Sequence, residues 1–123
     1  ETKMIFRAPK IERVSPLLQK LHWLSICCRI EHTLSSLCYS SLSGTGPQYL
    51  SDLIQVYTSS RCLRSSSDTR ILRIPTVKTK SYGQRSFAYQ GPTIWNKLPL
   101  EIRHQGTIDG LKRALKTHLF RFQ

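Results

Sequence analysis

The chain has 123 residues, the length of one ordinary domain, and it carries 19 Lys and Arg residues against 7 Asp and Glu residues, a formal net charge of +12. Leu, Ile, Val and Phe supply 33 of the residues, which is enough for a modest core and excludes a chain disordered throughout. No apolar run approaches the length of a membrane span, and no signal-peptide pattern lies near the start. We therefore expect one intracellular domain over residues 1–123, in the nucleus or the cytoplasm, without contact to a membrane.

Three helices are predicted in the first half, after an extended lead-in over residues 1–14. The first runs from Pro16 to Trp23, with Ser15 as its cap. The second covers residues 26–42, ends at Ser43-Gly44-Thr45-Gly46, and has Cys27, Ile30, Leu34, Leu37 and Cys38 on one stripe. The third opens at Pro47 and keeps helical spacing through Leu50, Leu53, Ile54 and Tyr57.

The Ser- and Thr-rich residues 58–69 predict a flexible loop. Apolar residues around Pro75 then predict a short β-hairpin or extended segment near residues 70–80. Gly83 and the Gly91-Pro92 pair interrupt the next segment, and Pro99 ends any helix there. Trp95 lies among apolar residues and Trp23 borders a leucine stripe, so both are expected in the core rather than as platforms for bases.

A closing amphipathic helix is the clearest element. Thr107 suits its N-cap, and Asp109 lies in the first turn, where the helix dipole favours an acid. Its apolar stripe consists of Ile108, Leu111, Leu115, Leu119 and Phe122, and Lys112, Arg113 and Lys116 occupy the other side. The expected fold class is α+β, mainly helical: a small single domain with three N-terminal helices, a short β-hairpin or extended segment, and this C-terminal helix.

The cysteines are Cys27, Cys28, Cys38 and Cys62, and they contain no C-x-x-C pair, so a disulfide framework is not indicated. Cys28 and His32 are four residues apart on one helical face, with His22 and Cys38 nearby. Structural zinc sites usually show two ligand pairs at tight spacing, whereas this chain has one. Buried cysteines that act as small hydrophobic residues explain the pattern more simply, and zinc stays an alternative.

Catalytic patterns are missing from the sequence. Two-metal chemistry needs paired carboxylates, but Asp52, Asp68 and Asp109 are isolated from one another. A nucleophile elbow, a phosphate-binding glycine loop and an H-E-x-x-H motif are absent as well. We therefore expect neither an enzyme nor a cofactor.

The charge pattern points to a polyanionic partner. Residues 30–60 carry a net charge of −2, whereas residues 61–85 carry +6. So strong a positive charge attracts nucleic acid above all, with an acidic protein or an anionic membrane as weaker fits. The expected phosphate-binding residues are Arg61, Arg64, Arg70, Arg73, Lys78, Lys80, Arg85, Lys112, Arg113 and Lys116.

Seven short strings follow one another between about Ile5 and Phe120. They are Leu21-His22-Trp23-Leu24 with Arg29-Ile30, Pro47-x-Tyr49-Leu50-Ser51-Asp52-Leu53, Arg61-x-Leu63-Arg64-Ser65-Ser66, Gly83-x-Arg85-Ser86-Phe87, Gly91-Pro92-x-x-Trp95-Asn96-x-Leu98-Pro99, Ile102-Arg103, and Leu115-Lys116-Thr117-His118-Leu119-Phe120. In this order they resemble the C-terminal region of the polyprotein of LINE-type (non-long-terminal-repeat) retrotransposons. The resemblance departs from the family pattern at Ser25, at His32-Thr33 and at Leu111.

The resemblance implies a parent protein with an endonuclease and a reverse transcriptase upstream, and places this region after the polymerase thumb. The catalytic motifs of both enzymes are absent here, and the chain begins at Glu1, so we expect a fragment. The function implied is a non-catalytic accessory region that binds RNA or DNA phosphates. The alternatives are a structural module that packs on the upstream reverse transcriptase, and a non-functional remnant of a decayed element.

Overall fold

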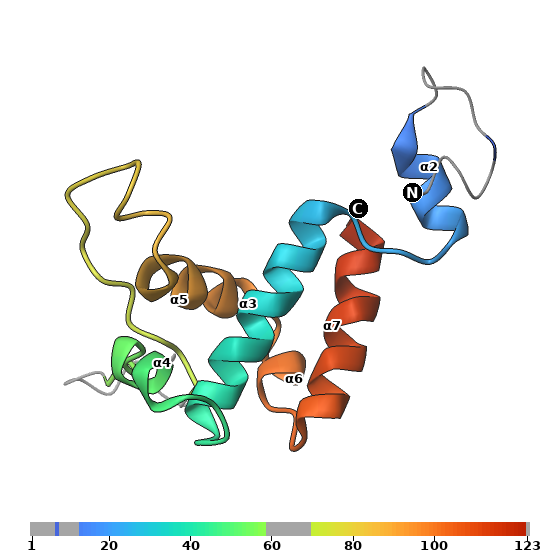
Figure 1. Ribbon diagram of the computed structural model, residues 1–123. Helices are drawn as coiled ribbons and strands as arrows, with labels where there is room; N and C mark the ends of the chain where they lie inside the picture. The colour runs from blue at the N-terminus through green and yellow to red at the C-terminus, as the bar shows by residue number, and fades with distance from the viewer. Residues whose placement is uncertain (1–6, 8–12, 59–69, 123) are drawn as a thin grey trace.

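The computed structural model describes residue 7, residues 13–58 and residues 70–122, and this part of the chain contains six helices (Figure 1). They are α2 (Val14–Lys20), α3 (Ile26–Leu42), α4 (Gln48–Leu53), α5 (Phe87–Lys97), α6 (Leu100–Arg103) and α7 (Ile108–Phe122). The mainly helical architecture is confirmed, and α3 has the predicted range. Most of the expected lead-in and of the expected loop over residues 58–69 lies outside the described residues. None of the helices described is long and apolar enough for a membrane crossing.

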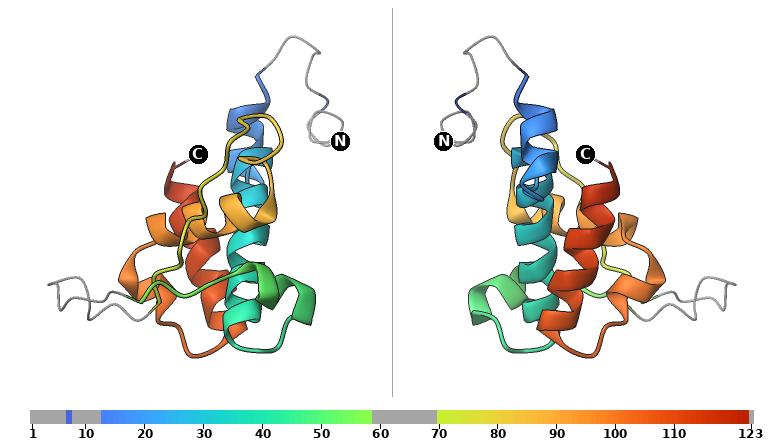
Figure 2. Two further views of the ribbon diagram at one scale, coloured as in Figure 1. Left: turned by 90° about the vertical axis from the view of Figure 1, so that its left-hand side faces the viewer. Right: turned by 90° about the vertical axis from the view of Figure 1, so that its right-hand side faces the viewer.

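The central element is α3, which α5 crosses on one side while α7 lies along the other (Figures 1 and 2). The Cys28 thiol, near the start of α3, donates to the carbonyl of Leu119 at the end of α7 (3.9 Å). Near the other end of α3, the Tyr39 hydroxyl donates to the carbonyl of Gln105, just before α7 begins (2.9 Å). These contacts show that α3 and α7 are antiparallel.

Local signals explain why α3 keeps its predicted bounds. At its start, the Ser25 hydroxyl accepts from the amide of Cys28 (3.4 Å) and so caps the helix. At its end, Gly44 adopts φ +72°, a conformation that glycine takes at no steric cost. The amides of Gly44 and Thr45 then donate to the carbonyls of Ser41 and Ser40, which is the Schellman pattern.

The predicted stripe on α3 is wrong in the first half of the helix. Cys27 is exposed and Ile30 is 53% exposed, whereas Cys38 is buried as expected. The reason is that α5 crosses only the later turns of α3, so its first turns are covered by α7 alone (Figure 1). The buried set of α3 is instead Ser35, Cys38, Tyr39 and Ser41.

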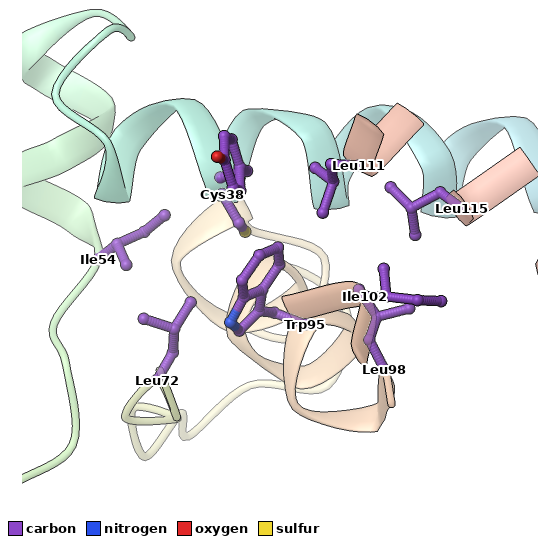
Figure 3. Close-up of a cluster of buried hydrophobic side chains, with 9 residues drawn as sticks. Cys38, Ile54, Leu72, Trp95, Leu98, Ile102, Leu111 and Leu115 are labelled. Carbon is purple, nitrogen blue, oxygen red and sulfur yellow. The ribbon is translucent and has the colours of Figure 1, made fainter. Parts of the chain in front are cut away.

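Trp95 of α5 lies at the centre of the core, as expected, and its side chain is fully buried (Figure 3). Its ring lies 6.4 Å from that of Tyr39, and its indole nitrogen donates to the carbonyl of Arg70 (2.8 Å). Leucines and isoleucines from the other elements complete the cluster around it: Ile54, Leu72, Leu98, Ile102, Leu111 and Leu115. One tryptophan thus joins α3, α5 and the segment that follows residue 70.

The expected β-hairpin is not present in the described residues, where extended pairing is limited to an isolated antiparallel bridge between Val56 and Leu72. The bridge is held by hydrogen bonds of the neighbouring residues, from the Tyr57 amide to the Ile71 carbonyl and from the Arg73 amide to the Gln55 carbonyl, so both backbone groups of Leu72 are left to bind the side chain of Asn96. The Leu72 amide donates to Oδ1 of Asn96 (2.9 Å), and Nδ2 of Asn96 donates to the Leu72 carbonyl (2.8 Å). The segment is therefore extended, but an amide side chain on α5 occupies the position where a partner strand would bind.

Gly91 and Pro92 were expected to interrupt the chain, yet both lie inside the continuous helix α5. Gly91 allows close helix contact, because a Cβ there would lie 3.0 Å from Sγ of Cys38. Pro92 is fully buried. Packing against α3 thus outweighs the cost of a proline inside a helix. Pro99 ends α5 as expected and also precedes α6, a short helix that the sequence analysis did not predict.

The first and third helices differ in their ends from the prediction. Helix α2 begins at Val14 with Arg13 as its N-cap, so Ser15 lies inside the helix and does not cap it. Helix α4 ends at Leu53, before Tyr57, because the chain turns extended there to reach the bridge at Val56.

The closing helix α7 has the predicted cap, since the Thr107 hydroxyl accepts from the amide of Gly110 (3.2 Å). Leu111, Leu115 and Leu119 form its buried stripe. Phe122 does not belong to that stripe, because it is 75% exposed at the free end of the helix.

Candidate nucleic-acid interface

The predicted basic residues do not form one face. Arg61 and Arg64 lie outside the described residues. The other eight form two groups on opposite sides of α3 (Figures 1 and 2). The loop group lies between α4 and α5 and consists of Arg70, Arg73, Lys78, Lys80 and Arg85; the helix group lies on α7 and consists of Lys112, Arg113 and Lys116.

Within the loop group, Arg70 has a structural contact that the sequence did not suggest. Its Nη1 donates to the carbonyl of Arg103 at the end of α6 (2.7 Å), and the residue is half-buried. Lys78, Lys80 and Arg85 are exposed around a turn in which the amide of Gly83 donates to the Thr79 hydroxyl (3.0 Å). These three side chains extend from the loop itself. The neighbouring Arg73 lines a hollow of about 440 Å³ between this segment, α4 and the start of α5, together with Leu53, Gln55, Ile74, Pro75, Thr76 and Ala88.

The helix group lies beside a groove between α3 and α7, which we call the α3–α7 groove. Its upper hollow has a volume of about 340 Å³ and is lined by His22, Trp23, Leu24, Arg29 and Lys116. Its lower hollow, of about 390 Å³, is lined by His32, Thr33, Ser36, Leu37, Ser40, Ile108 and Lys112. The groove thus combines one indole ring, two imidazole rings, two lysines, an arginine and several hydroxyl groups.

The two hollows follow one another along the helix pair. Arg29 in the upper hollow is one helical turn from Thr33 in the lower one, and Lys116 is likewise one turn from Lys112. His32 fixes the helices at this level, because its Nε2 donates to the backbone carbonyl of Lys112 (3.3 Å). Because Lys112 and Lys116 are four residues apart in a helix, their backbone positions are about 6 Å apart along the axis of α7.

Trp23 was expected in the core, but it is 37% exposed in the upper hollow. The cause is a second Schellman turn, in which the amides of His22 and Trp23 donate to the carbonyls of Gln19 and Leu18. His22 takes the left-handed position of this turn, with φ +52°, where glycine is usual. The imidazole of His22 stacks on Phe120 of α7, with ring centres 5.4 Å apart. This turn directs the chain away from α2 and brings Trp23 to the groove.

Arg29 links the turn to α3. Its Nε donates to the carbonyl of Leu24 (2.9 Å), and its guanidinium carbon lies 5.9 Å from the centre of the Trp23 ring, a cation–π contact. Among the residues described, Arg29, Lys112 and Lys116 make no ion pair with a carboxylate. Their charge is therefore directed to the solvent in the groove.

The residues considered for zinc do not converge. Cys28 and His32 do share one side of α3, but each binds a backbone carbonyl of α7. His22 stacks on Phe120, and Cys38 lies in the core, where burial raises the pKa of its thiol to about 12. In the described residues, no three His, Cys, Asp or Glu side chains are arranged to hold a metal ion.

Sequence reasoning did not assign His22 or Arg29 to the site, and it assigned Trp23 to the core. They come together with Lys116 only because the turn after α2 packs on the far end of α7, a contact across about ninety residues of sequence. The signal available in the sequence was the presence of an aromatic residue and an arginine in the same segment, since grooves for single strands combine aromatic rings with positive charge.

No protein-family model matches this sequence, and neither a curated protein nor a solved structure shows a significant match to it.

Proposed function

We propose that this chain is a non-catalytic nucleic-acid-binding region of a LINE-type retrotransposon reverse-transcriptase protein, and that it binds phosphates in the α3–α7 groove. The observation that supports it is the groove itself, where Arg29, Lys112 and Lys116 line two successive hollows without a carboxylate partner among the described residues. Such a region would act in the cytoplasm or the nucleus, on template RNA or target DNA, beside the upstream reverse-transcriptase domain.

The mechanism is counterion release. Each phosphate that a lysine or arginine neutralises frees condensed cations, so affinity falls steeply as salt rises. The contacts we propose are to the backbone and carry little sequence information. The hydroxyls of Thr33 and Ser36 donate to the carbonyls of Arg29 and His32 on their own helix, so their protons are not available to a phosphate oxygen.

The test compares two triple variants of equal charge change. One is Lys112→Gln/Arg113→Gln/Lys116→Gln on α7, and its matched control is Lys78→Gln/Lys80→Gln/Arg85→Gln in the loop. Binding to labelled RNA and DNA is titrated at several salt concentrations. The slope of log K against log salt is negative for a phosphate-binding protein. We expect the α7 variant to reduce the magnitude of this slope by about 2 to 3, and the loop variant to change it by less than about 1.

Arg70 is left out of the control on purpose, because its contact with Arg103 makes it a structural residue. Equal slopes for the wild type and the α7 variant would remove the groove from the proposal. A larger effect of the loop variant would move phosphate binding to residues 73–85.

A second candidate function is packing on the upstream polymerase. It is favoured by Ile26 and Ile30, which are 74% and 53% exposed and lie one turn apart on α3, where α5 does not reach. If this reading is right, Ile26→Ser/Ile30→Ser abolishes co-purification with the polymerase segment while nucleic-acid affinity stays unchanged. A decayed remnant would show neither activity.

A further inference from the structure

We propose that the upper hollow of the α3–α7 groove takes one unpaired base, which stacks on the indole of Trp23, so that the groove prefers single-stranded over duplex nucleic acid. This inference rests on the proposed function, since it names the form of nucleic acid that the same groove binds. It is carried by the position of Trp23 and by the groups around it.

Trp23 is held as a platform. Trp23 is 37% exposed, and the guanidinium carbon of Arg29 lies over its ring, 5.9 Å from the ring centre. The Schellman turn fixes the backbone at Trp23, and the stack of His22 on Phe120 fastens that turn to α7. A ring that is already held in place loses little freedom when a base stacks on it, so stacking there contributes most of its energy to binding.

The cations around Trp23 are placed for the phosphate that such a base carries. Because Nε of Arg29 binds Leu24, the guanidinium is fixed near the ring, and its η nitrogens have no partner among the described residues. Lys116 lines the same hollow, and Lys112 follows about 6 Å further along α7. That separation is comparable with the distance between neighbouring phosphates of one strand.

The stacking platform favours a single strand. The hollow around Trp23, of about 340 Å³, is open to the solvent and has room for one nucleotide. A base inside a duplex has both faces covered by its neighbours, whereas an unpaired base can leave the stack and offer a face to an aromatic side chain. A duplex can meet Lys112 and Lys116 but cannot place a base on Trp23.

The experiment uses the full chain with labelled oligothymidine and oligouridine of about 12 nucleotides, and a duplex of the same length. The variants are Trp23→Leu and Trp23→Phe, and the matched control is Tyr82→Leu, which removes an exposed aromatic ring from the loop between α4 and α5. We expect Trp23→Leu to weaken single-strand binding about five- to a hundredfold and duplex binding less than about twofold. Trp23→Phe should keep most of the affinity, and Tyr82→Leu all of it.

Tryptophan fluorescence supplies a direct readout. Trp95 is fully buried, so quenching by a bound single strand should come from Trp23 and should disappear in Trp23→Phe although that variant still binds. Similar results with the DNA and RNA strands would show that the base platform does not distinguish the sugars.

Two outcomes would overturn the inference while leaving the proposed function intact. In one, Trp23→Leu keeps its affinity for single strands while the α7 triple variant loses it. In the other, Trp23→Leu and Trp23→Phe weaken single-strand and duplex binding equally. A wild-type chain that binds neither form at low salt would refute the proposed function itself.

Discussion

Replacing Gly91 by alanine tests whether the contact between α5 and α3 is as close as described. The added methyl group would lie 3.0 Å from Sγ of Cys38 and 3.4 Å from Cε2 of Phe87. Alanine gains about 1 kcal/mol over glycine inside a helix. Overpacking in a closed core costs about 1–3 kcal/mol, and Cys38 is fully buried. We therefore expect Gly91→Ala to lower the free energy of unfolding by about 1 kcal/mol.

The sign of this effect should reverse when the sulfur is removed. In a Cys38→Ala background, the new methyl group fills the space that Sγ leaves, so Gly91→Ala should stabilise the protein by about 1 kcal/mol. Urea unfolding followed by circular dichroism gives the four free energies of the double-mutant cycle, with an expected coupling of about 2 kcal/mol. If Gly91→Ala had the same effect in both backgrounds, the two helices would not be in contact at these residues.

Four further predictions concern buried polar groups and the cysteines. Asn96→Ala leaves the amide and carbonyl of the buried residue Leu72 without partners and should cost about 2–4 kcal/mol in urea unfolding, while Asn96→Asp, which keeps the acceptor but places a second carboxylate oxygen against the Leu72 carbonyl, should not restore the lost stability. Ser35 has a buried hydroxyl without a partner in the described part of the chain, so Ser35→Ala should raise the unfolding free energy by up to about 1 kcal/mol; a loss above that size would contradict the reasoning. Because burial raises the pKa of Cys38 from 9.0 to about 12, the folded state holds its proton more tightly than the unfolded state does, and stability should fall as the pH rises above 9. Mass spectrometry after brief alkylation at pH 8 should find Cys27 modified and Cys38 intact until denaturant is added, whereas equal modification would show that the core opens readily.

The parts of the fold that local chemistry determines could be predicted. Helix α3 ends where Gly44 supplies a left-handed residue, and α7 starts where Thr107 caps it, so both ends are encoded within a few residues. Their length and spacing made the helical reading secure. Trp95 could be assigned to the core because its neighbours in sequence are apolar.

The remainder depends on contacts between distant residues. The segment after Arg70 resembles a strand in sequence, but its partner is the side chain of Asn96, which no pattern of alternation reveals. Pro92 signals a break by local rules, and only its burial in the finished core explains why α5 continues through it. In the candidate site, the helix lysines were predicted from their spacing. Trp23 was not, because its exposure follows from a histidine in a position where glycine is usual.

The pairing of Asn96 with Leu72 also bears on how copies of this chain behave toward one another. An extended segment with apolar residues ordinarily offers its open amides and carbonyls as a template on which a second molecule can add a strand, the first step toward insoluble aggregates. At Leu72 both groups on that side are already occupied by the amide of a helix. The side chain of Asn96 thereby hinders a second molecule from adding a strand along Ile71-Leu72-Arg73-Ile74. Asn96→Ala would remove this protection together with the contribution of Asn96 to stability.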